Sequence, residues 1–310
     1  MSFFLQYTLN EGTKDANWGS DFRCSPWGKV SRMRTCAVAV LIMLAIAGGA
    51  RAQTTDSAST EAEVSARLAG QPLLLRGFWA EDKLEFDSDG KPVANYRVGS
   101  FTEAGFAETG VKIKGDHLTI EGERMGIEFV DYGMPQRVQL LTSGKKNAPP
   151  EKITIEIDGH GNSDFSKELD AIFASRLRDV VETMPDYWQK FARKNFLDED
   201  DLPTKTKEVT VDPAKPFHVG GSVTPPKLLK QVDPEFDEAA RRMKYSGTSE
   251  IYFWLEPDGT PSHVSIAKPA GLGLDEQAVA AVSHYVFAPA MRDGQPVRVD
   301  LYVDVNFQIH

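Results

Sequence analysis

Residues 297–309 read Val-Arg-Val-Asp-Leu-Tyr-Val-Asp-Val-Asn-Phe-Gln-Ile, and this stretch decides the fold expected for the surrounding region. Every odd position is apolar, and every even position carries a polar or charged group. A period of two is that of a β-strand with one face on a core and the other face in solvent. The stretch therefore predicts a long strand whose odd-numbered side chains cover an apolar core.

The elements that precede this strand complete a small domain. We expect a helix over residues 234–244 with Asp233 as its cap, a strand over 249–255 and a hairpin turn at 257–259. A second strand and a helix capped by Asp275 follow before the final strand. The order α-β-β-α-β predicts an α+β domain in which two helices cover a three-stranded antiparallel sheet.

Short motifs follow one another in a fixed order through residues 217–310. They are Gly220-Gly221, Pro225-Pro226, Pro234-Glu235-Phe236, Ala239-Ala240-Arg241-Arg242, Gly247, Asp258-Gly259, Gly273-Leu274-Asp275, Phe287-Ala288-Pro289-Ala290, Gly294-Gln295-Pro296-Val297 and Val305-Asn306-Phe307. This series resembles the carboxy-terminal domain of TonB-family proteins. The family usually has Tyr-Pro where this chain has Phe236-Asp237, and Trp where it has Tyr285. Both replacements keep a large aromatic or a helix-starting residue.

The resemblance implies a domain that binds a short segment of an outer-membrane transporter through its last strand region, here residues 297–307. The three-stranded sheet itself leaves an edge that can accept an extended peptide by strand addition. The candidate partner-binding residues are Val299, Leu301, Tyr302, Val303, Val305 and Phe307. We expect the apolar odd positions mainly to build the core, so that partner contacts come from the backbone edge with help from Tyr302. Tyr252 and Trp254 are candidate exposed aromatics, or they pack under a helix or the preceding domain.

Residues 67–197 predict a separate β-rich domain that ends in helices. Short alternating segments are separated by turn signals, which is typical of an antiparallel sheet. Helical spacing then runs from Ser163 to Met184, and Pro185 ends it and opens a second short helix. Residues 198–216 begin with acidic residues and contain three prolines, so we expect a linker between the two domains.

The amino terminus carries an export signal. An uncharged apolar run follows Arg32 and Arg34 and ends at an Ala-x-Ala site, which predicts a signal peptide over 33–52 and cleavage between Ala52 and Gln53. The alternative is an uncleaved inner-membrane anchor over residues 36–50.

The residues on either side of the signal are not expected to fold. Residues 1–32 show no sustained periodicity, and we interpret them as a mis-assigned or disordered leader before a true start at Met33. Small polar residues over 53–66 predict a flexible segment. Export would place the protein in the periplasm or cell envelope.

The composition and the motifs argue against several functional classes. With 35 Lys and Arg against 45 Asp and Glu the formal charge is −10, which disfavours a nucleic-acid partner. The two cysteines, Cys24 and Cys36, fall in the segment removed with the signal. The six histidines lack the spacing of a helical zinc site, and His160 is interpreted as a loop residue. No nucleophile or phosphate-binding motif occurs, so we expect no enzyme, no cofactor and no metal.

Two functions remain after these exclusions. The first is a TonB-like cell-envelope protein that binds an outer-membrane transporter or another envelope protein and supports energy-coupled transport across the outer membrane. The second is a periplasmic or secreted binding protein that uses the same interaction module without energy transduction. The second reading follows from the absence of a long Pro-rich spacer, which the family usually carries. A homodimer is a further partner that the sequence leaves open, and the β-rich domain suggests no activity.

Overall fold

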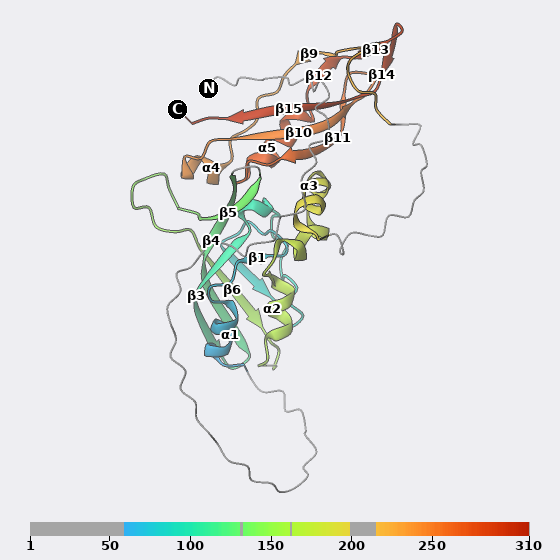
Figure 1. The fold of residues 1–310 in the computed structure, drawn as a ribbon. Coiled ribbons are helices and arrows are strands. Elements are labelled where there is room, and N and C mark those ends of the chain that lie inside the picture. Colours follow the sequence, from blue (N-terminus) through green and yellow to red (C-terminus); the bar gives the residue numbers. More distant parts are fainter. Residues whose placement is uncertain (1–58, 131–132, 162, 199–214, 310) are drawn as a thin grey trace, which may run out of the picture. The chain divides into compact units, whose positions relative to one another are not determined.

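The computed structural model describes residues 59–309 apart from 131–132, 162 and 199–214 (Figure 1). These residues belong to one compact unit. The predicted leader, the signal peptide with its cleavage site and most of the predicted linker lie outside the described residues. The flexible segment predicted over 53–66 is wrong at its end, because a capping box between Thr60 and Glu63 starts a helix at Glu61. We call residues 59–198 the N-terminal block and residues 215–309 the C-terminal block.

The N-terminal block is built on a seven-stranded sheet. Its helices are α1 (Glu61–Leu68), α2 (Ser166–Ile172) and α3 (Asp186–Phe196), with 3-10 turns η1 (Phe101–Glu103) and η2 (Leu177–Thr183). Its strands are β1 (Leu73–Leu75), β2 (Lys83–Phe86), β3 (Gly105–Lys114), β4 (His117–Val130), β5 (Met134–Gln139), β6 (Lys152–Asp158) and β7 (Phe173–Ala174). The strand order is β2-β6-β4-β3-β1-β7, and β5 also pairs with β4. All pairs are antiparallel, as predicted, except β2 with β6, which is parallel.

The predicted helix from Ser163 to Met184 is wrong in its middle. The chain leaves α2 at Phe173, forms the short strand β7 and then turns into η2. Phe173 and Ala174 pair with Leu75 and Leu74 of β1 at the edge of the sheet. Tertiary pairing thus overrides a helical pattern that is only a local preference.

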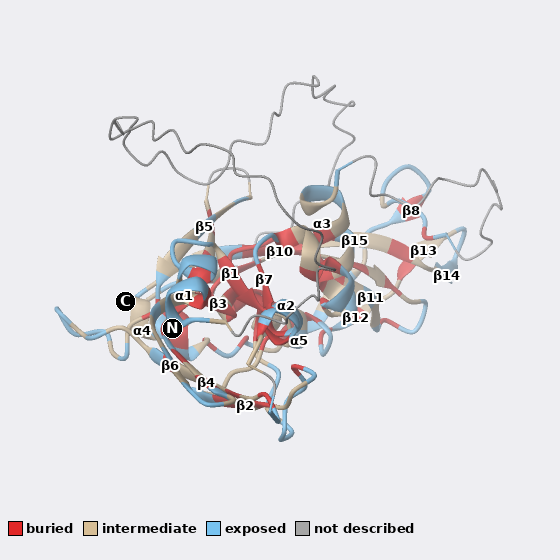
Figure 2. Ribbon diagram, turned by 90° about the horizontal axis from the view of Figure 1, so that it is seen from below, coloured by how far each residue is buried: buried red, intermediate tan, exposed pale blue. Residues whose placement is uncertain are grey.

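The C-terminal block has the predicted α+β order with small hairpins added. Its helices are α4 (Glu238–Met243) and α5 (Leu274–Val282). Its strands are β8 (Val223–Thr224), β9 (Lys227–Lys230), β10 (Gly247–Leu255), β11 (Pro261–Lys268), β12 (Val286–Ala288), β13 (Ala290–Arg292), β14 (Gln295–Val297) and β15 (Val299–Phe307). The main sheet has the order β11-β10-β15 and is antiparallel throughout, which confirms the predicted three-stranded sheet. Figure 2 shows buried residues along β10 and β15.

Both predicted helix caps are displaced. Asp237, rather than Asp233, caps α4, and its side chain accepts a hydrogen bond from the Ala239 N–H at 2.7 Å. Gly273 in a left-handed conformation precedes α5, while Asp275 lies inside the helix and is fully buried. The Asp275 side chain therefore accepts hydrogen bonds from the loop before the helix, at the Ala270 and Gly271 N–H groups, instead of capping the helix.

Backbone contacts join the two blocks along the end of β4. The Phe129 N–H donates to the Ala270 carbonyl at 3.1 Å, and the Leu272 N–H donates to the Ile127 carbonyl at 3.0 Å. Gly271 between them has a φ of +96°, and a Cβ there would lie 2.3 Å from the Ile127 carbonyl oxygen. Only glycine allows this approach, so the loop of one block continues the hydrogen bonding of the other block's sheet.

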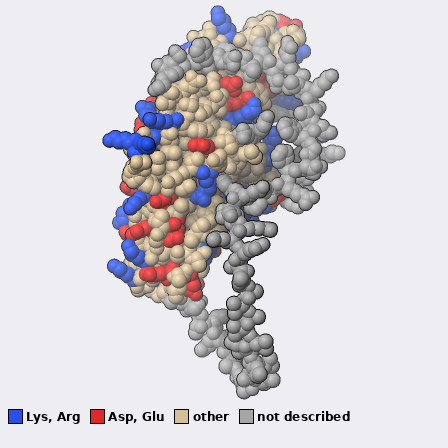
Figure 3. All heavy atoms as spheres, turned by 60° about the vertical axis from the view of Figure 1, so that its left-hand side comes forward, with Lys and Arg blue, Asp and Glu red and all other residues tan. Residues whose placement is uncertain are grey.

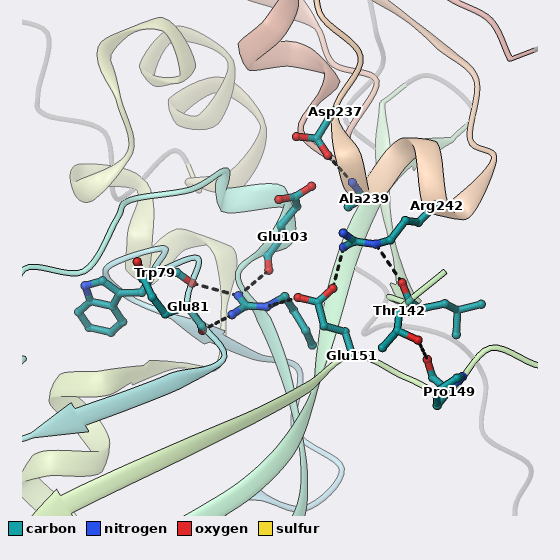
Figure 4. A network of polar contacts seen from close by, with 11 residues as sticks. Trp79, Glu81, Glu103, Thr142, Pro149, Glu151, Asp237, Ala239 and Arg242 are labelled. Carbon is teal, nitrogen blue, oxygen red and sulfur yellow. Dashed lines mark hydrogen bonds and ion pairs between the residues drawn. The ribbon is translucent and has the colours of Figure 1, made fainter. Parts of the chain in front are cut away.

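Two side-chain networks strengthen this contact between the blocks. In the first, the Glu276 Oε1 of α5 accepts from the Trp188 Nε1–H of α3 and from the Ser100 hydroxyl, each at 2.9 Å. In the second, the Arg242 Nη2 of α4 lies 2.7 Å from the Glu151 Oε2, and Glu151 also pairs with the buried Arg124 (Figure 4). The blocks are thus held by buried and half-buried polar groups as well as by packing.

Buried carboxyl groups make this contact sensitive to pH. Burial raises the pKa of Glu276 to about 7, and burial together with the neighbouring Asp237 raises the pKa of Glu103 to about 9. In the unfolded chain both groups titrate near 4.5. Their contribution to stability is therefore complete below that pH and is lost as the pH rises through about 7 for Glu276 and about 9 for Glu103.

We expect the free energy of unfolding to fall between about pH 5 and about pH 9, because each pKa unit is worth about 1.4 kcal/mol. Urea denaturation across this range measures it. The double variant Glu103→Gln with Glu276→Gln should give a flatter profile, since neither amide titrates. An equally steep profile in the double variant would show that other groups cause the dependence.

Candidate functional site

The final strand β15 presents its odd side chains to the core and its even side chains to the opposite face. Val299, Val303, Val305 and Phe307 are buried, while Leu301 and Tyr302 are half-buried. Four of the six candidate residues are therefore core residues whose side chains are turned away from any incoming partner. These four side chains would contribute to binding indirectly, because they hold the backbone of β15 in position.

One edge of β15 is paired and the other is partly open. Its nine residues pair with β10 in an unbroken register from Leu255↔Val299 to Gly247↔Phe307. On the opposite edge the Phe217 N–H donates to the Arg298 carbonyl at 2.9 Å, and the Asp300 N–H donates to the Phe217 carbonyl at 3.1 Å. Even-numbered residues of β15 therefore direct their backbone groups away from β10, because these groups alternate along a strand.

The open part of this edge begins after Asp300. By the same alternation, Tyr302 and Asp304 direct their N–H and C=O groups outward. Within the described part of the chain no strand pairs with them. An edge of this kind is a template for an extended peptide. Phe217 occupies the beginning of the edge, so an incoming segment would start at Tyr302.

The other edge strand of the same sheet, β11, is covered. Helix α3 of the N-terminal block packs against it. Covering an edge with a helix is a common way to prevent unwanted strand pairing. The structure therefore leaves β15 as the accessible edge strand of this sheet in the described residues.

The aromatic candidates on the sheet face are engaged within the chain. Tyr252 lies under the Lys190 Nζ of α3 at 3.7 Å from the ring centroid, and it accepts a hydrogen bond from the Trp254 Nε1–H at 2.8 Å. The Trp254 ring stacks on His263 with a centroid distance of 4.0 Å. Tyr252 and Trp254 are half-buried, and Tyr252 packs beside Tyr302 with ring centroids 5.0 Å apart. Tyr302 is therefore the aromatic of this sheet face that lies on the edge strand itself.

The surface beside the open edge is acidic. Burial and the neighbouring Glu250 raise the pKa of Asp304, and burial raises the pKa of Tyr302. Lys268 neutralises Glu250 at 2.8 Å. The Asp304 carboxylate, near Glu250 as well as Lys268, favours a partner segment that brings a neutral or basic side chain to this position. On the face of the molecule drawn in Figure 3, basic and acidic side chains are intermixed.

Comparison with known proteins agrees with this geometry. A family model described as Gram-negative bacterial TonB protein C-terminal matches residues 232–309, which include α4, β10, β11, α5 and β15. A curated relative, Protein TonB of Vibrio cholerae serotype O1, is 27% identical over 86 residues, covering 27% of this chain and 35% of that protein. The match thus spans about a third of the relative's length. Residues 232–309 form a TonB C-terminal domain.

Proposed function

We propose that this chain is a TonB-like cell-envelope protein that binds an extended segment of an outer-membrane transporter, or of another envelope protein, by strand addition to β15. The observation that carries the proposal is the open edge at Tyr302 and Asp304 in a TonB C-terminal domain whose other edge strand is covered by α3. The bound segment would form backbone hydrogen bonds, with Tyr302 beside it and Asp304 selecting against acidic side chains. The role is one of binding, not of catalysis.

We further propose a layout of two folded regions behind an export signal. The β-rich region over 67–197 would form one domain and residues 217–310 the other, joined by a linker over 198–216. In the described residues no helix combines the length and apolarity needed to cross a bilayer. Amino-terminal sequencing of the protein from envelope fractions tests the export step. A chain beginning at Gln53 supports a periplasmic protein, whereas an intact anchor over 36–50 supports coupling to the inner membrane.

Replacing Asp304 by proline tests the edge directly. Proline removes the outward N–H, while the β10 ladder uses the odd-numbered residues and keeps its hydrogen bonds. We expect Asp304→Pro to weaken partner binding at least about tenfold, which corresponds to about 1.4 kcal/mol or one hydrogen bond. Asp304→Ala is the matched control, since it removes the same carboxylate but retains the N–H, and it should lose much less affinity than Asp304→Pro.

The measurement is a pull-down from outer-membrane extract with the whole purified protein as bait, read by mass spectrometry. Recovery of β-barrel transporters by the parent and by Asp304→Ala, with loss in Asp304→Pro, supports strand addition. Equal recovery by all three proteins would contradict the role of the edge. Failure of the folded parent to recover any such transporter would contradict the transporter as partner.

A further inference from the structure

Two aspartates and two histidines meet at one end of the N-terminal sheet. Asp116 lies in the turn between β3 and β4, and His117 begins β4. His117 is directly opposite Asp158, the last residue of β6, in the antiparallel register. His160 follows in the next turn. The four residues come from two separate segments of the sequence, and strand pairing brings these segments together.

Backbone hydrogen bonds fix the two turns to each other. The Gly159 N–H donates to the Asp116 carbonyl at 2.8 Å, and the Gly161 N–H donates to the Asp116 Oδ2 at 2.7 Å. The His160 N–H donates to the Asp158 Oδ1 at 3.0 Å. His160 has a φ of +48°, a left-handed conformation that is uncommon for a residue with a side chain. Both carboxylates are therefore oriented by the fold, independently of any ligand.

The potential ligand atoms of Asp116, His117 and Asp158 lie close to one another, and His160 contacts Asp158. The His117 Nε2 lies 3.5 Å from the Asp116 Oδ1, and its Nδ1 lies 3.7 Å from the Asp158 Oδ1. The His160 Nδ1 lies 3.1 Å from the same Asp158 oxygen. In a tetrahedral zinc site with bonds of about 2.0–2.2 Å, ligand atoms are about 3.3–3.6 Å apart. One ligand atom from each of Asp116, His117 and Asp158 already lies within 4.8 Å of the other two.

We propose that Asp116, His117 and Asp158 bind a zinc-class divalent cation, with His160 as the fourth ligand. Two imidazoles and two carboxylates suit Zn²⁺, whereas Ca²⁺ and Mg²⁺ prefer sets made of oxygen alone. His117 would coordinate through one of its two ring nitrogens. The site lies outside the TonB C-terminal domain, so it is independent of strand addition at β15.

The sequence does contain a signal for this site, but it differs from the histidine spacing of a helical zinc site. Asp116-His117 and Asp158-Gly159-His160 each place an aspartate beside a histidine at the end of a strand. Each pair by itself is an ordinary turn. The register between β4 and β6 places the two pairs side by side, with His117 opposite Asp158.

Calorimetric titration of the untagged, whole protein with Zn²⁺ tests the proposal. We expect one saturable site in the parent. His117→Gln and His160→Gln should each weaken it at least about tenfold, because even loss of an outer partner of a metal ligand costs about 10–100-fold. Both side chains are exposed, so the variants should fold, and their circular dichroism confirms it.

His218→Gln is the matched control. His218 also lies beside a carboxylate, with its Nδ1 2.7 Å from the Asp300 Oδ1, but it lies in the C-terminal block, remote from the proposed ligands, so this variant should leave the affinity unchanged. Ca²⁺ and Mg²⁺ should produce no heat of binding at the site. Absence of saturable Zn²⁺ binding, or equal affinity in His117→Gln and the parent, would overturn the proposal. Equal binding of Mg²⁺ would overturn the mixed-ligand assignment.

Discussion

Arg124→Met is expected to lower the free energy of unfolding by about 3–5 kcal/mol, the loss typical of removing one partner from a buried ion pair. Only 4% of Arg124 is exposed. Its guanidinium donates to the carbonyls of Trp79 at 3.0 Å, Glu103 at 3.3 Å and Glu81 at 2.6 Å. Its Nε lies 3.2 Å from the Glu151 Oε1 (Figure 4). Methionine keeps much of the volume but leaves three buried carbonyls without this donor.

The effect should extend to the contact between the blocks. Glu151 holds Arg124 through one carboxylate oxygen and Arg242 of α4 through the other. Chemical denaturation with two probes, one in each block, should show both transitions displaced together. Arg67→Met is the control, because Arg67 forms an ion pair with Asp170 on the surface, where such pairs contribute little. A loss below about 1 kcal/mol in Arg124→Met would contradict a structural role for the buried charge.

The second large effect is expected at Asp275. This fully buried side chain accepts hydrogen bonds from the Ser249 hydroxyl at 2.6 Å, the Ala270 N–H at 2.8 Å and the Gly271 N–H at 2.7 Å. Burial raises the pKa of Asp275, and these bonds oppose that increase. Asp275→Ala would leave three buried donors without an acceptor, so we expect a loss of about 3 kcal/mol or more.

Ser249→Ala separates the contribution of the Ser249 hydroxyl from that of the two backbone N–H groups that donate to Asp275. It removes one of the three bonds and should cost about 1 kcal/mol. Because Asp275 holds the loop that pairs with β4, Asp275→Ala should also accelerate hydrogen exchange at the Leu272 amide, which bonds to Ile127. Unchanged exchange at Leu272 together with a large loss of global stability would contradict a local role in the contact between the blocks.

The C-terminal fold was predictable because its signals are local. Alternation in β15 assigns each side chain to a face, and the structure places Val299, Val303, Val305 and Phe307 in the core accordingly. The hairpin between β10 and β11 is marked by its turn residues in the same way. Such features depend on residues that are neighbours in the sequence. They can therefore be recognised from the amino-acid sequence without knowledge of the tertiary structure.

The rest depends on pairings between distant residues. Phe173 lies within a helical pattern, yet it pairs with Leu75 of β1, which is far away in the sequence. Phe217 lies at the predicted start of the C-terminal domain, where no sequence pattern indicates a strand. In the structure its backbone nevertheless pairs with the first part of the β15 edge. No local sequence pattern predicts that Lys190 lies over the Tyr252 ring or that Trp188 donates a hydrogen bond to Glu276. These contacts decide which part of the edge is accessible, and they arise only when the two blocks pack.

Helix α3 also affects how the protein can be divided experimentally. A fragment limited to the C-terminal block would lose the cover that α3 gives to β11, and the fully buried Leu272 would gain contact with water. Glu276 would lose its bonds to Trp188 and Ser100, and would ionise as it became hydrated. A fragment with this new apolar surface and second free edge is prone to self-association. The N-terminal block thus covers a strand edge and apolar surface that an isolated TonB C-terminal domain of this chain would expose to water.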